Sequence, residues 1–398
     1  MRDVTITGMS VFTPRAATLE DFWTSLSTPH GTSAGRVHTV VDDLIVSSIA
    51  AADRRRCARS TQLALAGALA AIDDSGLDDA TVATRDRRGV LLGTGFGASN
   101  ELIEAAALLS ERGPRFVSPV LAVLAIPEAA ASAVANRLGY RGPCEIAGAA
   151  CATGALTIGR AAFLIAAGLC DVIVAGAVEE VLPDVIRTSM DRLGVTSKAG
   201  TTRPFDARRD GFVASEGAAV VVLEATEHAR ARGARRYADV VGCGSCADAA
   251  ALTSPEAEGT LRAMDLALGT FAGARVDPAL VGYVNAHGSA TASNDLAEAR
   301  AVDELFSGVL DPPWLGGIKG ATGHMLGAAG AVEVVASSLA LYRSTVPPTV
   351  GCEVVADDVA MCRVAIAPET LEKPVVLSNS RGLGGHNVTV SLRACNND

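Results

Sequence analysis

The sequence has few charged and few aromatic side chains, and it has no apolar run long enough to cross a membrane. Charged residues make up 20% of the 398 residues, and aromatic residues make up 4%. Arg160 and Glu333 interrupt the two longest apolar stretches, so neither reaches the roughly 18 residues of a transmembrane helix. The first residues include Asp3 and lack a sustained apolar core, so we expect no signal peptide. These absences predict a cytoplasmic protein with no membrane partner.

Neither a disulfide framework nor a nucleic-acid surface is indicated. The nine cysteines are an odd number at irregular spacing in a long chain, so we expect free thiols. The formal net charge of −10 argues against nucleic acid as a partner. Cys243 and Cys246 have CxxC spacing, but no second pair or histidine lies near them in the sequence, and we predict no metal site.

Hydrophobic residues, at 49%, and 40 glycines indicate a large core with closely packed elements. Apolar periodicity predicts strands at 4–11, 88–95, 171–179, 218–224, 236–241, 281–286, 374–378 and 387–392. It predicts helices at 19–26, 63–71, 101–109, 126–137, 151–168, 225–233, 257–270, 293–305 and 327–342. This alternation predicts an α/β fold with mostly parallel sheets covered on both faces. Because the order of elements repeats after the helix at 225–233, we predict two similar halves, 1–235 and 236–398.

Cys151 lies among small residues at the expected start of a buried helix. A helix N-terminus carries partial positive charge, which favours thiolate over thiol. A small, inert core cysteine is the alternative reading for a single residue of this kind. Reactive side chains in other turns at strand ends would favour the reactive cysteine over the inert one.

Three further turns carry reactive side chains. His287 follows an apolar strand, with Ser289 and Thr291 close behind it. Lys319 and His324 precede a glycine-flanked helix. Residues 379–387 form a glycine-rich turn between the last two expected strands, and His386 lies at its end. Because α/β folds build sites at strand ends, these turns and Cys151 are expected to meet in one site.

The chain at this point resembles the β-ketoacyl-acyl-carrier-protein synthases of the thiolase superfamily. The likeness rests on the Cys151 stretch, residues 203–206 with 210–218, the His287 motif, residues 319–330 and the terminal glycine loop, all in family order. It covers nearly the whole chain. The resemblance implies a thiolase-like fold with two βα halves in α-β-α-β-α layers. It also implies an acyltransferase that performs a decarboxylating Claisen condensation in fatty-acid or, as we favour, specialised polyketide biosynthesis.

The family chemistry assigns roles to these residues. Cys151 would carry the acyl group, and the N–H groups of Cys151 and Leu383 would form the oxyanion hole. His287 and His324 would bind the malonyl thioester as neutral rings that donate from Nε2. Lys319, paired with Glu333, would orient them. The resemblance predicts the remaining substrate contacts at Ser289, Thr291, Phe96, Arg381, Leu383 and Gly384.

The resemblance also implies an acidic acyl carrier protein as partner, with substrates held on its phosphopantetheine arm and no other cofactor. The expected docking residues are Arg54, Arg55, Arg56, Arg59 and Arg203. A solvated helix start is the alternative explanation for the first four. The family is dimeric, and the chain would pair with itself or with a ketosynthase-like paralogue.

Arg381 and Leu383 depart from the family, which commonly has phenylalanine at both positions. An unpaired buried guanidinium would be costly. Arg381 is therefore expected to have a carboxylate partner, face water, or meet a polar substrate or partner subunit. Phe96 either restricts the acyl chain or packs ordinarily.

Two other functions remain open from the sequence. A non-catalytic, chain-length partner of a ketosynthase heterodimer characteristically lacks the cysteine. A thiolase or acyltransferase would acylate without releasing carbon dioxide.

Overall fold

The computed structural model describes residues 1–398 except 28–42, 44–46, 48, 78–83, 251–255, 270, 272 and 396–398. The described strands are β1 (Val4–Phe12), β2 (Arg88–Gly93), β3 (Cys144–Glu145), β4 (Val172–Glu179), β5 (Gly217–Ala225), β6 (Ala238–Ala247), β7 (Val281–Asn285), β8 (Trp314–Gly316), β9 (Thr345–Val346), β10 (Arg363–Val364), β11 (Glu369–Thr370), β12 (Val375–Gly382) and β13 (His386–Arg393). The described helices are α1 (Leu19–Ser27), α3 (Ala51–Arg54), α4 (Arg59–Ser75), α5 (Ser99–Arg112), α6 (Leu121–Leu124), α7 (Ala129–Leu138), α8 (Thr153–Ala166), α9 (Asp184–Leu193), α10 (Thr226–Ala231), α11 (Ala257–Ala267), α12 (Ala292–Leu305), α13 (Lys319–Thr322) and α14 (Ala329–Arg343).

The large sheet consists of two matching runs of strands. One run has the order β1-β5-β4-β2-β3, and the other has the order β6-β13-β12-β7-β8, with β10 beyond it. In each run the first two pairings are antiparallel and the next two are parallel. Among the described residues, the strand pairing that joins the two runs is that of Thr5 and Ile6 of β1 with β6. Two stretches of chain therefore share one topology, while the division at residue 235 stays a prediction.

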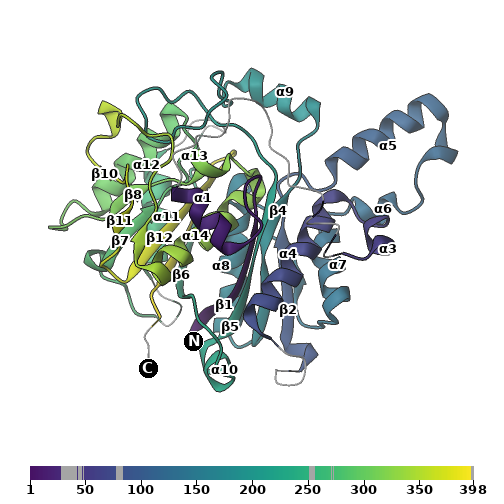
Figure 1. Ribbon diagram of the computed structural model, residues 1–398, viewed down its shortest axis with the longest axis horizontal. Helices are drawn as coiled ribbons and strands as arrows, with labels where there is room; N and C mark the ends of the chain where they lie inside the picture. The colour runs from purple at the N-terminus through teal and green to yellow at the C-terminus, as the bar shows by residue number, and fades with distance from the viewer. Residues whose placement is uncertain are drawn as a thin grey trace.

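Helices α8 and α14 form the middle layer of the molecule (Figure 1), and each contacts strands of both runs. On the outer faces, α4 and α7 pack on the first run, and α11 packs on the second run beside α12. This is the α-β-α-β-α order that we expected.

Small residues allow the two central helices to approach closely. A Cβ added at Gly154 of α8 would overlap the backbone of Ala331 in α14. The reciprocal contact exists as well, since a Cβ at Gly330 would lie 2.7 Å from the backbone nitrogen of Ala155. The two helices thus meet in a pseudo-twofold contact beside the turns that precede them.

The prediction of mostly parallel sheets is wrong. Strand β5 runs antiparallel to both of its neighbours, and so does β13. A continuous apolar run reports burial on both faces of a strand and says nothing about its direction. The β12–β13 hairpin also closes through only three residues, Leu383 to Gly385, which forces antiparallel pairing.

An arm projects from the side of the first run (Figure 1), comprising α5, α6 and the residues between them. No residue of α5 is buried in the chain. Its exposed apolar side chains, with those of the following residues, are Leu102, Ile103, Leu109, Phe116, Val120 and Val123.

Candidate active site

A cavity of about 300 Å³ brings together three of the reactive side chains named from the sequence. Cys151, His287 and His324 all line it. Its apolar wall includes Met190 and Phe212. The remaining lining residues are Leu193, Gly194, Val195, Asp248, Ser289, Thr291, Ser293, Asn294, Leu326, Arg381, Gly382, Leu383 and Gly385. Both runs of strands therefore contribute to one site.

Cys151 lies in a single 3₁₀ turn, Ala150–Ala152, that leads directly into α8. Ala150 has a φ of 49°, a left-handed conformation that non-glycine residues adopt at a cost in free energy. The turn is held by a hydrogen bond of 2.9 Å from the Ala149 N–H to the hydroxyl of Thr153. This strained turn places the thiol at the amino end of a helix while keeping it buried.

Burial raises the pKa of the Cys151 thiol to about 12, and the Glu179 and Glu333 carboxyls add to this effect. The nearby Lys319 ammonium and an N–H donated by Leu383 act in the opposite direction. Burial thus favours the thiol, in the direction opposite to the preference for thiolate that the helix position led us to expect. Removing the thiol from water outweighs the lowering effects of Lys319 and the Leu383 N–H on the pKa.

His287 follows β7 and is positioned by a carboxylate that the sequence reading did not single out. The N–H groups of His287 and Gly288 each donate to Glu298 of α12 over 2.8 Å. Asn294 donates to the same carboxylate over 3.0 Å. In the sequence, Glu298 is simply an acidic residue in the helix that follows His287. This pattern is too common to identify Glu298 as a partner of the histidine.

His324 lies directly before the 3₁₀ turn Leu326–Ala328 that opens α14. Its Nδ1 accepts a hydrogen bond of 3.2 Å from the Leu326 N–H. Phe212 packs edge-on against its ring, with centroids 4.6 Å apart. The ring of His287 lies 5.1 Å away at an interplanar angle of 77°. The two imidazoles are therefore direct neighbours.

Both histidines have Nδ1 occupied as an acceptor. The Nδ1 of His287 lies 3.3 Å from the Lys319 ammonium, which has only donors to offer. The proton of each ring therefore resides on Nε2. Burial, followed by the charge of Lys319, lowers the pKa of both rings well below 6.5. The site thus presents two neutral Nε2–H donors.

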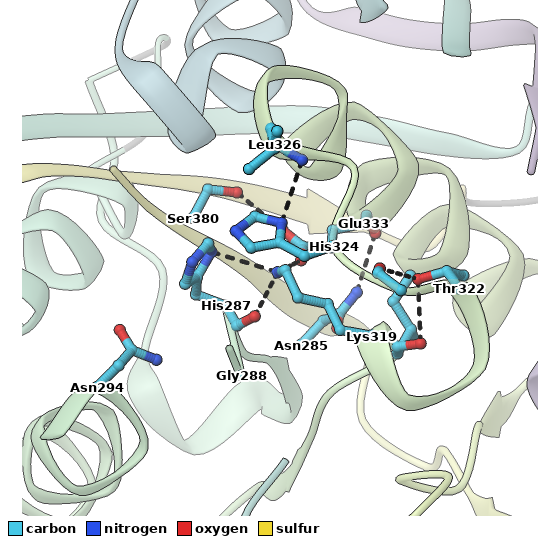
Figure 2. A network of polar contacts seen from close by, with 12 residues as sticks. Asn285, His287, Gly288, Asn294, Lys319, Thr322, His324, Leu326, Glu333 and Ser380 are labelled. Carbon is cyan, nitrogen blue, oxygen red and sulfur yellow. Dashed lines mark hydrogen bonds and ion pairs between the residues drawn. The ribbon is translucent and has the colours of Figure 1, made fainter. Parts of the chain in front are cut away.

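Lys319 and Glu333 form a buried ion pair behind the histidines (Figure 2). Lys319 also donates to the carbonyl of His287, and the second oxygen of Glu333 accepts from Ser380 over 3.0 Å. The pairing that we expected between this lysine and Glu333 is present. It connects α13, α14, β7 and β12 in one network.

The β12–β13 turn lies against Cys151. The Leu383 N–H donates to the Cys151 thiol. Its role as an oxyanion-hole donor stays a prediction. Gly382 allows this approach, because an added Cβ would overlap the carbonyl of Ala149. Gly384 and His386 are exposed and do not line the cavity.

Arg381 has a carboxylate partner, one of the alternatives that we expected. Its Nη2 donates to Asp248 over 3.2 Å and to the Glu256 carbonyl over 3.1 Å. The side chain is only 6% exposed and lines the cavity.

The other predicted substrate contacts differ in position. Ser289 and Thr291 line the cavity, with their hydroxyls 2.9 Å apart. Phe96 does not line it and is 38% exposed at the base of the arm. Its backbone N–H instead donates to Glu179 over 3.2 Å.

The predicted docking arginines lie outside the cavity and fall into two kinds. Arg55 and Arg56 are exposed beside α3, while Arg54 and Arg203 are partly buried. Arg59 forms a two-pronged contact with the fully buried Glu216, at 2.9 and 2.5 Å, which ties the start of α4 to the strand region before β5.

Two absences hold for the part of the chain that the structure describes. No cluster of three or more histidine, cysteine or acidic side chains there could hold a metal ion. No helix in those residues combines the length and apolarity needed to cross a membrane.

Sequence profiles match most of the chain. The β-ketoacyl synthase N-terminal domain matches residues 30–229, and the C-terminal domain of the same family matches residues 237–353. This chain belongs to the β-ketoacyl synthase family. The 3-oxoacyl-[acyl-carrier-protein] synthase 2 of Rhizobium meliloti (strain 1021) is 35% identical to it, with 99% of each chain covered.

Two solved ketosynthase structures have the same thiolase-like fold. The ishigamide ketosynthase/chain length factor superposes with a TM-score of 0.90 at 27% identity, covering 99% of this chain and all of that one. A type II polyketide ketosynthase in complex with its acyl carrier protein and bound to a hexaketide gives 0.87 at 26% identity, with the same coverage.

Proposed function

We propose that this β-ketoacyl synthase condenses an acyl thioester with malonyl thioester, both delivered on the phosphopantetheine arm of an acyl carrier protein. The observation that carries the proposal is one cavity lined by Cys151 and by two neutral histidines that donate from Nε2. A thiol can hold an acyl group, and two neutral donors can stabilise an enolate. Together they suit an acyltransferase that forms carbon–carbon bonds.

In the first step Cys151 attacks the carrier-bound acyl group. The thiol is protonated at rest, so its proton leaves as the new bond forms and ends on the departing pantetheine thiol. The N–H groups of Cys151 and Leu383 would donate to the tetrahedral oxyanion. One such donor is typically worth about 2.7–4 kcal/mol of transition-state stabilisation.

In the second step the malonyl thioester carbonyl accepts hydrogen bonds from His287 and His324. Loss of carbon dioxide leaves an enolate, whose charge these donors stabilise. The enolate carbon attacks the acyl carbonyl on Cys151. The β-ketoacyl thioester leaves on the carrier, and the thiolate of Cys151 takes up a proton.

Lys319 and Glu333 act through the histidines. The ammonium fixes the Nδ1 of His287 as an acceptor and lowers the pKa of both rings. Glu333 balances its charge in the dry interior, where an unpaired ammonium would be costly.

Intact mass spectrometry and carbon dioxide release test this reaction. With acyl carrier protein charged by a saturated chain, we expect one acyl adduct, absent in Cys151→Ala and retained in Cys144→Ala, which removes an exposed thiol. Malonyl carrier should then discharge the adduct and release carbon dioxide. No adduct would indicate the chain-length partner subunit. An adduct without carbon dioxide release would indicate a simple acyltransferase or thiolase.

We also propose specialised polyketide synthesis over housekeeping fatty-acid synthesis. Arg381 places a guanidinium in a cavity where the family commonly has phenylalanine. Comparing acylation by medium saturated chains with that by unsaturated or aromatic chains tests this assignment. Equal use of long saturated chains would contradict it.

Arg55 and Arg56 are exposed and available to an acidic carrier, whereas Arg59 is committed to Glu216. The apolar arm of α5 and α6 is proposed to pair with a second ketosynthase chain, identical or paralogous. No resident cofactor is needed for these steps, because the substrates supply both carbons of the new bond. We place the reaction in the cytoplasm, which suits nine free thiols.

A further inference from the structure

We propose that Arg381 is a specificity-determining residue that binds an oxygen atom of the acyl chain carried by Cys151, so that the cavity selects oxygenated acyl groups over saturated ones. The inference rests on the condensing function proposed above and adds the class of acyl group. The Arg381 guanidinium is hydrogen-bonded through Nη2, whereas its Nη1 has no partner among the described residues.

A hydrogen-bond network holds Arg381 in place. Asp248 accepts from Arg381 over 3.2 Å through one oxygen and from Asn387 over 2.6 Å through the other. The Asp248 N–H donates to the Gly385 carbonyl over 2.8 Å, which ties the aspartate to the β12–β13 turn. Thr260 in turn donates to Asn387 over 3.0 Å. The guanidinium is thus held in one place before any substrate arrives, which reduces the entropy lost on binding.

The unpartnered side is Nη1 of the same guanidinium. This nitrogen is buried, and no acceptor among the described residues lies within hydrogen-bonding distance of it. Arg381 lines the cavity with Cys151 and His324. An acyl chain reaches Nη1 when the guanidinium turns about its Nη2 anchor toward the cavity. A hydrocarbon chain there would leave the donor unsatisfied, whereas a carbonyl or hydroxyl oxygen would satisfy it. Sites with a buried polar group discriminate strongly against ligands that lack its partner.

The acyl chain is a better source of that oxygen than the malonyl carboxylate. Asp248 already balances the charge of Arg381, so a neutral acceptor suffices. A guanidinium bound to the malonyl carboxylate would stabilise the charge that decarboxylation must remove. Such binding favours the ground state over the transition state and slows the reaction.

The experiment compares three six-carbon chains on the same carrier protein: hexanoyl, 3-oxohexanoyl and 5-oxohexanoyl. The rate of Cys151 acylation is followed by intact mass for the wild-type enzyme, Arg381→Met and Asp248→Asn. The readout is the ratio of oxo-chain to hexanoyl rates within each protein, so partial loss of folded enzyme cancels. Arg363→Met, which removes an exposed arginine paired with Asp311, is the matched control.

We expect at least one oxo chain to react about tenfold faster than hexanoyl in the wild type and in the Arg363 control. The ratio should approach one in Arg381→Met and fall in Asp248→Asn. Equal rates in the wild type, or a preference that survives in Arg381→Met, would overturn the proposal. So would a changed KM for malonyl carrier with an unchanged ratio, which would assign Arg381 to the extender carboxylate. Failure of every chain to acylate Cys151 would instead overturn the condensing function.

Discussion

Lys319 links the stability of the protein to its chemistry through one ammonium group. It is buried with Glu333 and contacts both the ring and the carbonyl of His287. An isolated buried charge is costly, so each partner of this pair depends on the other. In the proposed mechanism the same ammonium leaves the Nε2–H of His287 to face the substrate.

Lys319→Met should therefore reduce stability and selectively impair decarboxylation. We expect the free energy of unfolding to fall by about 3–5 kcal/mol in urea titrations, because Glu333 loses its partner. Acylation of Cys151 should decrease less than carbon dioxide release. Lys373→Met, which removes a partly exposed lysine paired with Asp311, should cost at most about 1 kcal/mol. Equal losses of unfolding free energy in the two variants would show that the buried ion pair stabilises the protein no more than an exposed one.

The two histidines predict a pH dependence of stability. Their pKa values in the folded protein lie well below 6.5 because they are buried. Above pH 6.5 both rings are neutral in the folded and unfolded states and contribute nothing. Below pH 6.5 the unfolded chain takes up protons that the folded chain does not, so stability falls as pH decreases, by about 1.4 kcal/mol per pH unit for each ring.

This slope is measured as the difference between the wild type and a His287→Asn, His324→Asn double variant between pH 7 and 5. Burial raises the pKa values of Glu179, Glu180 and Asp295 to about 7, which opposes the histidine slope, but these carboxyls are present in both proteins. The wild type should lose more stability on acidification than the double variant. Parallel curves would mean that the rings are protonated in the folded state.

At the scale of elements, the contact between α8 and α14 determines how the turns beside Cys151 and His324 face one another. The turn with Cys151 precedes α8, and the turn after His324 precedes α14. Gly154 and Gly330 set the separation of these helices. The spacing of nucleophile and donors therefore depends on two positions that lack side chains.

Gly154→Ala should force the helices apart. We expect a loss of several kcal/mol in unfolding free energy, as overpacked cores show, and slower discharge of the acyl enzyme by malonyl carrier. Gly308→Ala is the control, because an added Cβ there meets nothing within 4 Å. An unchanged melting temperature in Gly154→Ala would indicate that the helices can shift without cost.

The sequence predicted most elements and the meeting of Cys151, His287 and His324, because apolar periodicity and strand-end turns are local signals. It did not predict α9, whose ten residues bury only Met190 and so lack a broad apolar face. It also missed Glu298 and the raised pKa of Cys151. Both depend on which distant segments exclude water from the site, and no local pattern records that. The prediction of strand direction was wrong for the same reason.

At the scale of the whole molecule, part of the surface is positively charged although the net charge is negative. The chain carries −10 overall, yet Arg55 and Arg56 present positive charge at the surface. Association with an acidic carrier depends on this local field, which salt screens within about 10 Å at 0.1 M.

Arg55→Glu with Arg56→Glu should therefore raise the KM for acyl carrier protein about tenfold or more at low salt, because like charges then face the carrier. Acylation by a small N-acetylcysteamine thioester should stay unchanged. Arg393→Glu, an exposed charge reversal at the far end of β13, is the control. If both substrates suffer equally in the double variant, docking does not involve these arginines.

The projecting arm predicts an oligomer. Leu109→Glu with Val123→Glu places charges on its exposed apolar side chains and should shift the protein toward a monomer in sedimentation velocity. Leu310→Glu, at a fully exposed leucine outside the arm, should leave the sedimentation coefficient unchanged. A paralogous partner would instead appear as a monomeric wild type that gains mass only when the second chain is added.

The two matching 3₁₀ turns differ in the residue at their centre. Ala150 and Leu326 open them with similar left-handed φ angles of 49° and 45°, so Gly327 occupies the place that Cys151 holds in the other half. No side chain fits at Gly327, because its Cβ would overlap the backbone of Gly95 and crowd Glu179. The turn at Leu326–Ala328 is therefore closed to a second nucleophile. The two aligned turns thus present a single thiol, that of Cys151, which is consistent with the proposed loading of one acyl group per chain.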